Sequence, residues 1–206
     1  MSDYSESVFI NCPFDASFAP HFRAIVYALI RLGFIPRFAW TEGPRIVRIM
    51  ELIRVCRFGI HDLSMQSLDT GTGLPRFNMP FELGLFMGCR HFSADAEQNS
   101  KDLLILDSVP DRIHKSLSDF VGFDIACHNS SPERAIQLVR DWLANSLEKR
   151  MYGAGKLQSE FRQFESQLPL MAEYLKSHPD QIDKTDICYL VREWIRGAFS
   201  EVPSAG

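Results

Sequence analysis

The segment VFINCPFDAS, residues 8–17, sets the pattern that the rest of the chain repeats. Its apolar run from Val8 to Asn11 has the length of a buried strand, and the Cys-Pro-Phe-Asp that follows ends it in a turn. Apolar residues then recur at helical spacing between Arg23 and Leu32. A strand followed by a helix is half of a βαβ unit, so this segment predicts an α/β fold.

The same alternation continues as far as residue 150. Further strands are expected over 34–40, 57–63, 102–107 and 122–127, and further helices over 45–56, 79–89, 111–120 and 132–147. Strands that alternate with helices pair in parallel through right-handed crossovers. We therefore expect residues 1–150 to form a doubly wound, flavodoxin-like α/β domain with a five-stranded parallel sheet and helices on both faces.

A different pattern begins after residues 152–155, Tyr-Gly-Ala-Gly, which we interpret as a hinge. An apolar stripe at helical spacing follows, and a second helix is expected over 185–199. The stripe consists of Leu157, Phe161, Phe164, Leu168 and Met171. Two helices bury little surface alone, so we expect residues 156–206 to be a C-terminal helical extension. It would pack on the α/β domain or join two copies into a homo-oligomer.

The composition argues against several classes of protein. The chain has 206 residues and a formal net charge of −4, which disfavours general nucleic-acid binding because phosphates attract basic surfaces. Its five cysteines are an odd number without regular spacing, so a secreted disulfide framework is not expected. The start of the chain has no signal-peptide pattern, and no apolar run approaches the roughly 20 residues of a membrane span. We expect a cytoplasmic protein that does not contact membranes.

A ligand site is expected beyond the carboxyl ends of the strands, where open parallel sheets bind their ligands. The residues that this rule selects are Asn11, Pro13, Phe14 and Asp15 after the first strand, Trp40 and Arg45 after the second, His61, Asp62 and Ser64 after the third, and Asn78 and Glu82 at the third helix. Structural roles remain open for them. Asp15 and Asp62 are also typical turn or N-cap residues. Trp40 also suits a core, and Arg45 a solvated face.

Glu82 lies in RFNMPFELG, residues 76–84, where a glycine-containing loop becomes an apolar helix. Pro80 suits the first turn of a helix, so the helix is expected to begin near Asn78 or Met79. Residues four apart share one face, which would point Asn78 and Glu82 the same way. Glu82 is then either a capping-box residue or a catalytic carboxylate that the helix dipole keeps ionised.

Several catalytic and cofactor motifs are absent. The chain has no GxGxxG, Walker or GxSxG sequence, and no cysteine or histidine pair at zinc-ligand spacing, so neither a cofactor nor a metal is expected. Asp15 and Asp62 follow the first and third strands, as phosphoacceptors do in receiver domains. Residues 124–128, at the end of the fifth strand, contain no lysine, which disfavours that function.

Three segments resemble a known superfamily. VFINCPFD at the first strand, GIHDLS at the third and FNMPFELG at the third helix are similar to the superfamily that joins nucleoside 2-deoxyribosyltransferases and TIR domains. The resemblance covers Val8 to Leu147. It implies that Asp62 binds the sugar, that Glu82 attacks the anomeric carbon, and that Asn78 lies beside it. The first loop, Cys-Pro-Phe, departs from the small residues that are usual in the transferases.

The resemblance implies an N-glycosidase-type enzyme, a hydrolase or a transferase, that cleaves or transfers the N-glycosidic bond of a nucleoside, a nucleotide or NAD. A carboxylate suits this chemistry because it stabilises or captures an oxocarbenium-like sugar. Trp40 or Phe14 could stack on the base, and Arg45 or Arg76 could bind a phosphate. The alternative is a non-catalytic nucleotide-binding sensor or TIR-like interaction module, in which Glu82 is only a cap.

Overall fold

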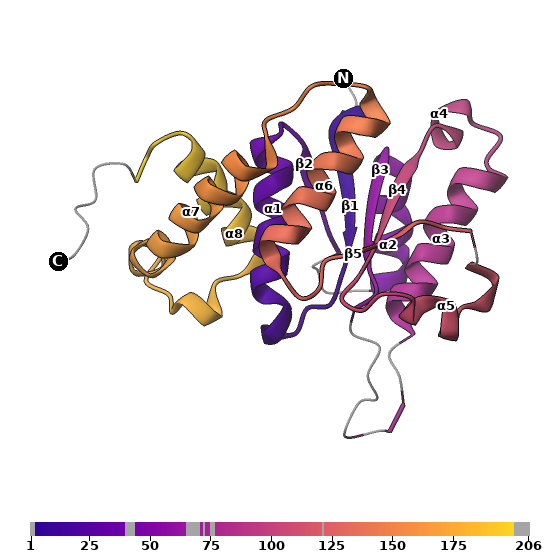
Figure 1. Cartoon of the computed structure of the whole chain (residues 1–206), viewed down its shortest axis with the longest axis horizontal. Helices are drawn as coiled ribbons and strands as arrows, with labels where there is room; N and C mark the ends of the chain where they lie inside the picture. Colours follow the sequence, from indigo (N-terminus) through magenta and orange to yellow (C-terminus); the bar gives the residue numbers. More distant parts are fainter. Residues whose placement is uncertain are drawn as a thin grey trace.

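The chain forms one five-stranded sheet in which all neighbouring strands are parallel (Figure 1). The computed structural model describes residues 3–39, 44–64, 71, 73–74, 77–120 and 122–199. The strand order is β2-β1-β3-β4-β5. The strands are β1 (Ser7–Asn11), β2 (Ile35–Arg37), β3 (Phe58–Asp62), β4 (Asp102–Asp107) and β5 (Ile125–Cys127). This order confirms the predicted flavodoxin-like, doubly wound sheet.

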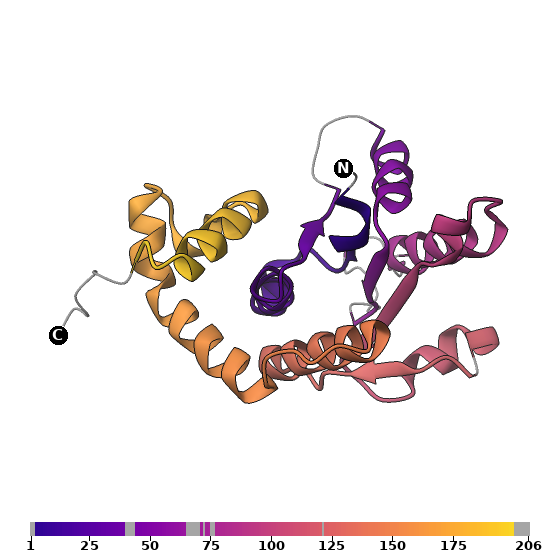
Figure 2. The same ribbon diagram turned by 90° about the horizontal axis from the view of Figure 1, so that it is seen from above.

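Helices cover both faces of the sheet (Figure 2). Helices α1 (Ala19–Arg31) and α6 (Pro132–Leu147) pack on one face, and α2 (Arg45–Val55) and α3 (Asn78–Phe92) pack on the other. The short elements are η1 (Asp3–Glu6), η2 (Ala16–Phe18), α4 (Ala96–Asn99), α5 (Arg112–Ser116), η3 (Ser118–Phe120) and η4 (Pro179–Gln181). No helix within these described ranges is both long and apolar enough to cross a membrane.

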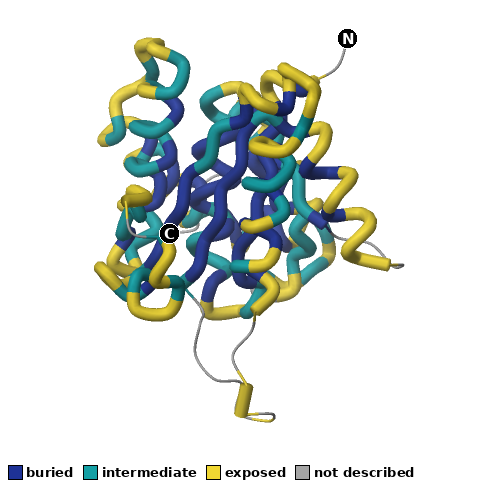
Figure 3. Tube along the Cα trace, turned by 90° about the vertical axis from the view of Figure 1, so that its right-hand side faces the viewer, coloured by how far each residue is buried: buried dark blue, intermediate teal, exposed yellow. Residues whose placement is uncertain are grey.

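The central strands are buried on both sides, as Figure 3 shows in dark blue. In β1, Val8 and Ile10 join the core under α1 and α6, whereas Phe9 joins the core under α2 and α3. Successive side chains of a strand point to opposite faces, so one apolar run supplies both cores. The register pairs Asn11 with His61, which aligns the carboxyl ends of β1 and β3.

The C-terminal helices α7 (Ala154–Tyr174) and α8 (Lys184–Ile195) pack outside α1 and α6. All five residues of the predicted stripe are buried, and Phe161 and Phe164 contact the ring of Tyr27 on α1. Each large apolar side chain buried in this way contributes about 1.5–3 kcal/mol. The stripe is therefore covered within the same chain, whereas the predicted homo-oligomer remains a prediction.

Two ion pairs fasten α7 to α1. Arg23 donates two hydrogen bonds to the Glu165 carboxylate, at 2.6 and 2.7 Å. Arg31 donates to Glu160 at 2.9 Å. All four side chains are at most 27% exposed, and the bidentate Arg23 pair has the geometry that makes such contacts worth more than an open surface pair.

Some predicted boundaries are longer than the observed elements. The strands expected over 34–40 and 122–127 are reduced to the three residues of β2 and β5, because each lies at an edge and pairs along one side only. The helix expected over 111–120 is divided into α5 and η3, with the break at Leu117. Helix α8 ends at Ile195 rather than at residue 199.

Candidate functional site

The candidate site lies at the carboxyl edge of the sheet, where Asn11 ties the ends of two strands to α3. Asn11 is buried, and its Nδ2 donates to the Met79 carbonyl at 2.8 Å. The same Nδ2 lies 3.0 Å from Nδ1 of His61. Since the amide is the donor, Nδ1 of His61 is the acceptor and its proton is on Nε2. Asn11 thus fixes the first turn of α3 against β1 and β3, and Glu82 follows on the same buried face as Met79.

Glu82 is a buried carboxyl group with one nearby cation. It is 5% exposed, and its Oε1 lies 3.9 Å from Nη2 of Arg45 at the start of α2. Burial raises the pKa of Glu82 to about 6, and Arg45 opposes that rise. A carboxyl with this pKa is still about 90% ionised at pH 7.

The capping-box interpretation of Glu82 does not fit the helix start. The N-cap of α3 is Phe77, which makes no side-chain cap hydrogen bond, and Glu82 is the fifth helical residue rather than the third. Glu82 therefore does not cap α3. Asn78, the first residue of α3, is exposed, whereas Glu82 is buried.

Asp62 is fully buried at the end of β3 and combines a turn contact with a histidine contact. Its Oδ1 accepts the Ser64 N–H at 2.9 Å, as its structural interpretation predicts. Its Oδ2 lies 3.2 Å from Nε2 of His128, and the Ser64 hydroxyl lies 2.8 Å from the same nitrogen. Oδ2 and Nε2 of His128 are not aligned for a hydrogen bond, and Oδ2 accepts no hydrogen bond from the described residues. It can therefore still accept one from a ligand. A ligand hydroxyl would reach it only after a neighbouring side chain moves.

His61 is a structural histidine. Burial lowers its pKa to about 3, so the ring is neutral at physiological pH. The ring packs edge-on against Phe9 and Phe86. A Cβ on Gly59 would lie 2.8 Å from both His61 Nε2 and the Phe86 ring, so this strand position requires glycine.

Phe14 lies under two cations at the same edge. The guanidinium of Arg45 is 5.5 Å from the ring centroid, and the ammonium of Lys184, the first residue of α8, is 4.5 Å from it. Pro13, Phe14 and Asp15 line a cavity of about 250 Å³ together with Lys184. Burial is the main cause that raises the pKa of the Cys12 thiol, and the Asp62 and Glu82 carboxylates add to it. The first loop, both carboxylates and α8 therefore meet in one region.

Sequence reasoning missed two of these residues, His128 and Lys184. His128 directly follows β5, so the rule that selected Asn11 and Asp62 would also have selected it. Lys184 had no such signal, because only the packing of α8 on α1 brings it to the site. Trp40 and Arg76 lie outside the described residues.

The fold and site together define a doubly wound α/β protein with a carboxylate site at the carboxyl edge of its sheet. In the part of the chain that the structure describes, no three histidine, cysteine or acidic residues form a group that could hold a metal. Comparisons with protein-family models, with curated proteins and with solved structures found no match.

Proposed function

We propose that this protein is an N-glycosidase-type enzyme that cleaves or transfers the N-glycosidic bond of a nucleoside, a nucleotide or NAD, with Glu82 as the nucleophile. The observation that carries the proposal is the burial of the Glu82 carboxyl at the carboxyl edge of the sheet, with Arg45 as its nearest cation. A buried acidic side chain destabilises a fold, and proteins retain such groups most often at functional sites.

The reaction would proceed through two displacements at the anomeric carbon. A Glu82 oxygen forms a bond to this carbon while the C–N bond breaks and its electron pair leaves with the base. Water or an acceptor hydroxyl then attacks the same carbon, loses a proton and releases the Glu82 carboxylate. Arg45 supports the first step because it favours the ionised form of Glu82.

Asp62 is proposed to bind a sugar hydroxyl through Oδ2, which retains acceptor capacity. The Ser64 N–H, which donates to Oδ1 at 2.9 Å, would hold this carboxylate in place, and Nε2 of His128 lies 3.2 Å from Oδ2. The positioning of an acceptor by a neighbouring donor is a common support for a binding residue.

The cations near Phe14 favour substrates that carry phosphate. Arg45 and Lys184 would bind a phosphate while the exposed part of the Phe14 ring contacts the base. Nucleotides and NAD satisfy both contacts, and a nucleoside satisfies only one. We expect the Lys184→Gln variant to raise KM for a nucleotide more than KM for the matching nucleoside.

The decisive experiment measures base release from NAD, nucleosides and nucleotides by chromatography, with thermal melts run in parallel. Glu82→Gln should fold and bind ligand, yet lose turnover by several orders of magnitude. Asp62→Asn should weaken both binding and rate, because a hydroxyl contact acts in the ground state and in the transition state. The matched control is Glu51→Gln on α2, whose carboxylate is exposed beside Arg48.

Two results would contradict the proposal. If wild type releases base and Glu82→Gln retains most of that activity, Glu82 is not the nucleophile. If wild type binds nucleotides tightly and cleaves none of them, the protein is a nucleotide sensor on the same fold.

A further inference from the structure

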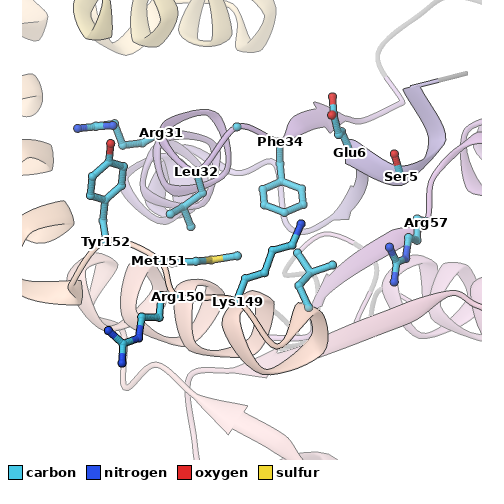
Figure 4. Close-up of a pocket in the computed structure, with 12 residues that line it drawn as sticks. Ser5, Glu6, Arg31, Leu32, Phe34, Arg57, Lys149, Arg150, Met151 and Tyr152 are labelled. Atoms are coloured by element: carbon cyan, nitrogen blue, oxygen red, sulfur yellow. The ribbon is translucent and has the colours of Figure 1, made fainter. Parts of the chain in front are cut away.

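A second cavity lies at the opposite, amino edge of the sheet (Figure 4). Its volume is about 580 Å³, within the range of small-molecule sites. Its walls come from η1, the end of α1, the residue before β3, and the segment that links α6 to α7. Helix α1 separates it from the Glu82 site by about 20 Å, since its 13 residues rise about 1.5 Å each.

Basic side chains outnumber acidic ones in the lining of this cavity, with Arg31, Arg57, Lys149 and Arg150 against Glu6. Arg57 and Lys149 form no ion pair within the described residues, although the chain as a whole has a net charge of −4. In Figure 4 the Lys149 side chain extends toward Phe34 and Arg57, whereas Arg150 extends away from them. Nε of Arg57 is buried and has no hydrogen-bond partner among the described groups. A buried donor without a partner is costly, which indicates a missing acceptor.

Apolar side chains line the same cavity. They are Leu32, Phe34, Leu147 and Met151. The arrangement therefore offers a cationic pair beside an apolar surface. A ligand that uses both carries an anionic group and a planar or apolar group.

Two helix ends lie at this cavity, and backbone N–H groups cap part of each of them. Helices α1 and α6 both end at the cavity, and cations often bind the last carbonyl groups of a helix. Here backbone N–H groups already bond several of those carbonyls. The N–H groups of Leu32, Gly33 and Phe34 bond carbonyls at the end of α1. The N–H groups of Glu148 and Lys149 bond carbonyls at the end of α6. The Arg57 guanidinium lies over the Phe58 ring, 4.8 Å from its centroid, and neither it nor the Lys149 ammonium forms an ion pair among the described residues.

We propose that this cavity binds a nucleotide, with its phosphate between Arg57 and Lys149 and its base against the half-buried side chains of Leu32, Leu147 and Met151. Guanidinium and ammonium groups form charge-assisted hydrogen bonds with phosphate, and a base gains from burying its apolar face against aliphatic side chains. Bound there, the nucleotide is too far from Glu82 to be its substrate. The inference does not depend on the proposed reaction.

The test is calorimetric titration of ADP, pyrophosphate and adenosine into full-length Glu82→Gln, which removes turnover at the other site. Adding Lys149→Gln should raise the Kd for ADP by about tenfold or more, because one charge-assisted contact is lost. High salt should weaken the binding of ADP to this cavity, because it screens the phosphate contacts. Arg57→Gln should have a similar effect on the Kd. If Arg57→Gln folds poorly, Lys149→Gln still tests the proposal, because Lys149 is exposed and its replacement should not disturb folding. Arg162→Gln, on the exposed side of α7, is the matched control and should leave the Kd unchanged.

Other outcomes would overturn the assignment. ADP binding that is unchanged by Lys149→Gln but lost in Arg45→Gln would place all nucleotide binding at the Glu82 site. Failure to bind ADP at millimolar concentration in low salt would exclude a nucleotide site here. Equal affinity for pyrophosphate and ADP would show that the base does not contact the apolar side chains of the cavity. The proposal is supported if ADP binds more tightly than pyrophosphate and adenosine do and if Lys149→Gln weakens that binding. This result would support both the phosphate contact and the base contact.

Discussion

Replacement of Glu82 by glutamine should stabilise the protein at neutral pH. The pKa of Glu82 is raised from 4.5 to about 6, chiefly by burial, so the ionised form is destabilised in the folded state. One pKa unit corresponds to about 1.36 kcal/mol, which gives an upper estimate of about 2 kcal/mol for this shift. Glutamine has nearly the same shape and no charge, so it removes the penalty.

The pH dependence of this gain has a definite sign. Below pH 4.5 the carboxyl is protonated in both the folded and the unfolded state, and the two proteins should be equally stable. As the pH rises from 4.5 to about 6, the unfolded state ionises first, so wild type loses stability relative to the variant. Above that window the difference should be constant.

The assay is urea and thermal unfolding of both proteins between pH 4 and pH 8. For a chain of this size, 2 kcal/mol corresponds to a rise in Tm of about 4–8 °C at pH 7. Glu173→Gln, an exposed carboxylate on α7, is the control and should change stability by no more than about 0.5 kcal/mol at any pH. A Glu82→Gln difference that does not vary with pH would refute the raised pKa and, with it, the argument that burial tunes this group.

Three further predictions concern activity and packing. If an ionised Glu82 is the nucleophile, kcat/KM for base release should fall about tenfold between pH 7 and pH 5, measured with a substrate that does not titrate in that range. Phe164→Ala should lower the free energy of unfolding by about 3–5 kcal/mol in urea titrations, because Phe164 is fully buried. Phe92→Ala, at a position that is 84% exposed, should change it by no more than about 0.5 kcal/mol. Gly59→Ala should lower Tm, since a Cβ there would lie 2.8 Å from neighbouring ring atoms, whereas Gly84→Ala in α3 meets nothing within 4 Å and should stabilise by about 0.5–1 kcal/mol. Similar melting temperatures for the two glycine variants would contradict that steric argument.

The elements that the sequence predicted best are those with strong local signals. The strand expected over 102–107 and the helix expected over 132–147 match β4 and α6 residue for residue. The helix has Pro132 at its start and Ser131 as an N-cap whose hydroxyl accepts the Arg134 N–H. Edge strands β2 and β5 were overestimated because their length depends on pairing, which local patterns do not contain.

The residues of the candidate site also differ in whether a local sequence pattern predicts them. Asn11, Asp62 and Glu82 could be predicted because each stands at a strand or helix end that the fold class places on one edge. Lys184 could not, since its place near Phe14 depends on how α8 packs. Lys101 is a comparable case elsewhere. It is a fully buried lysine whose Nζ donates to the Ile53 carbonyl at 2.7 Å, and no pattern in its neighbourhood predicts that contact.

The cover that α7 and α8 provide for α1 has a consequence for synthesis of the chain. Helix α1 leaves the ribosome early, but α7 begins roughly 120 residues later, which is about 6–24 s of translation at typical rates. We expect the outer side of α1, including Tyr27, to stay uncovered for that interval. A nascent chain arrested before residue 154 should therefore bind chaperones or aggregate more readily than one released at full length.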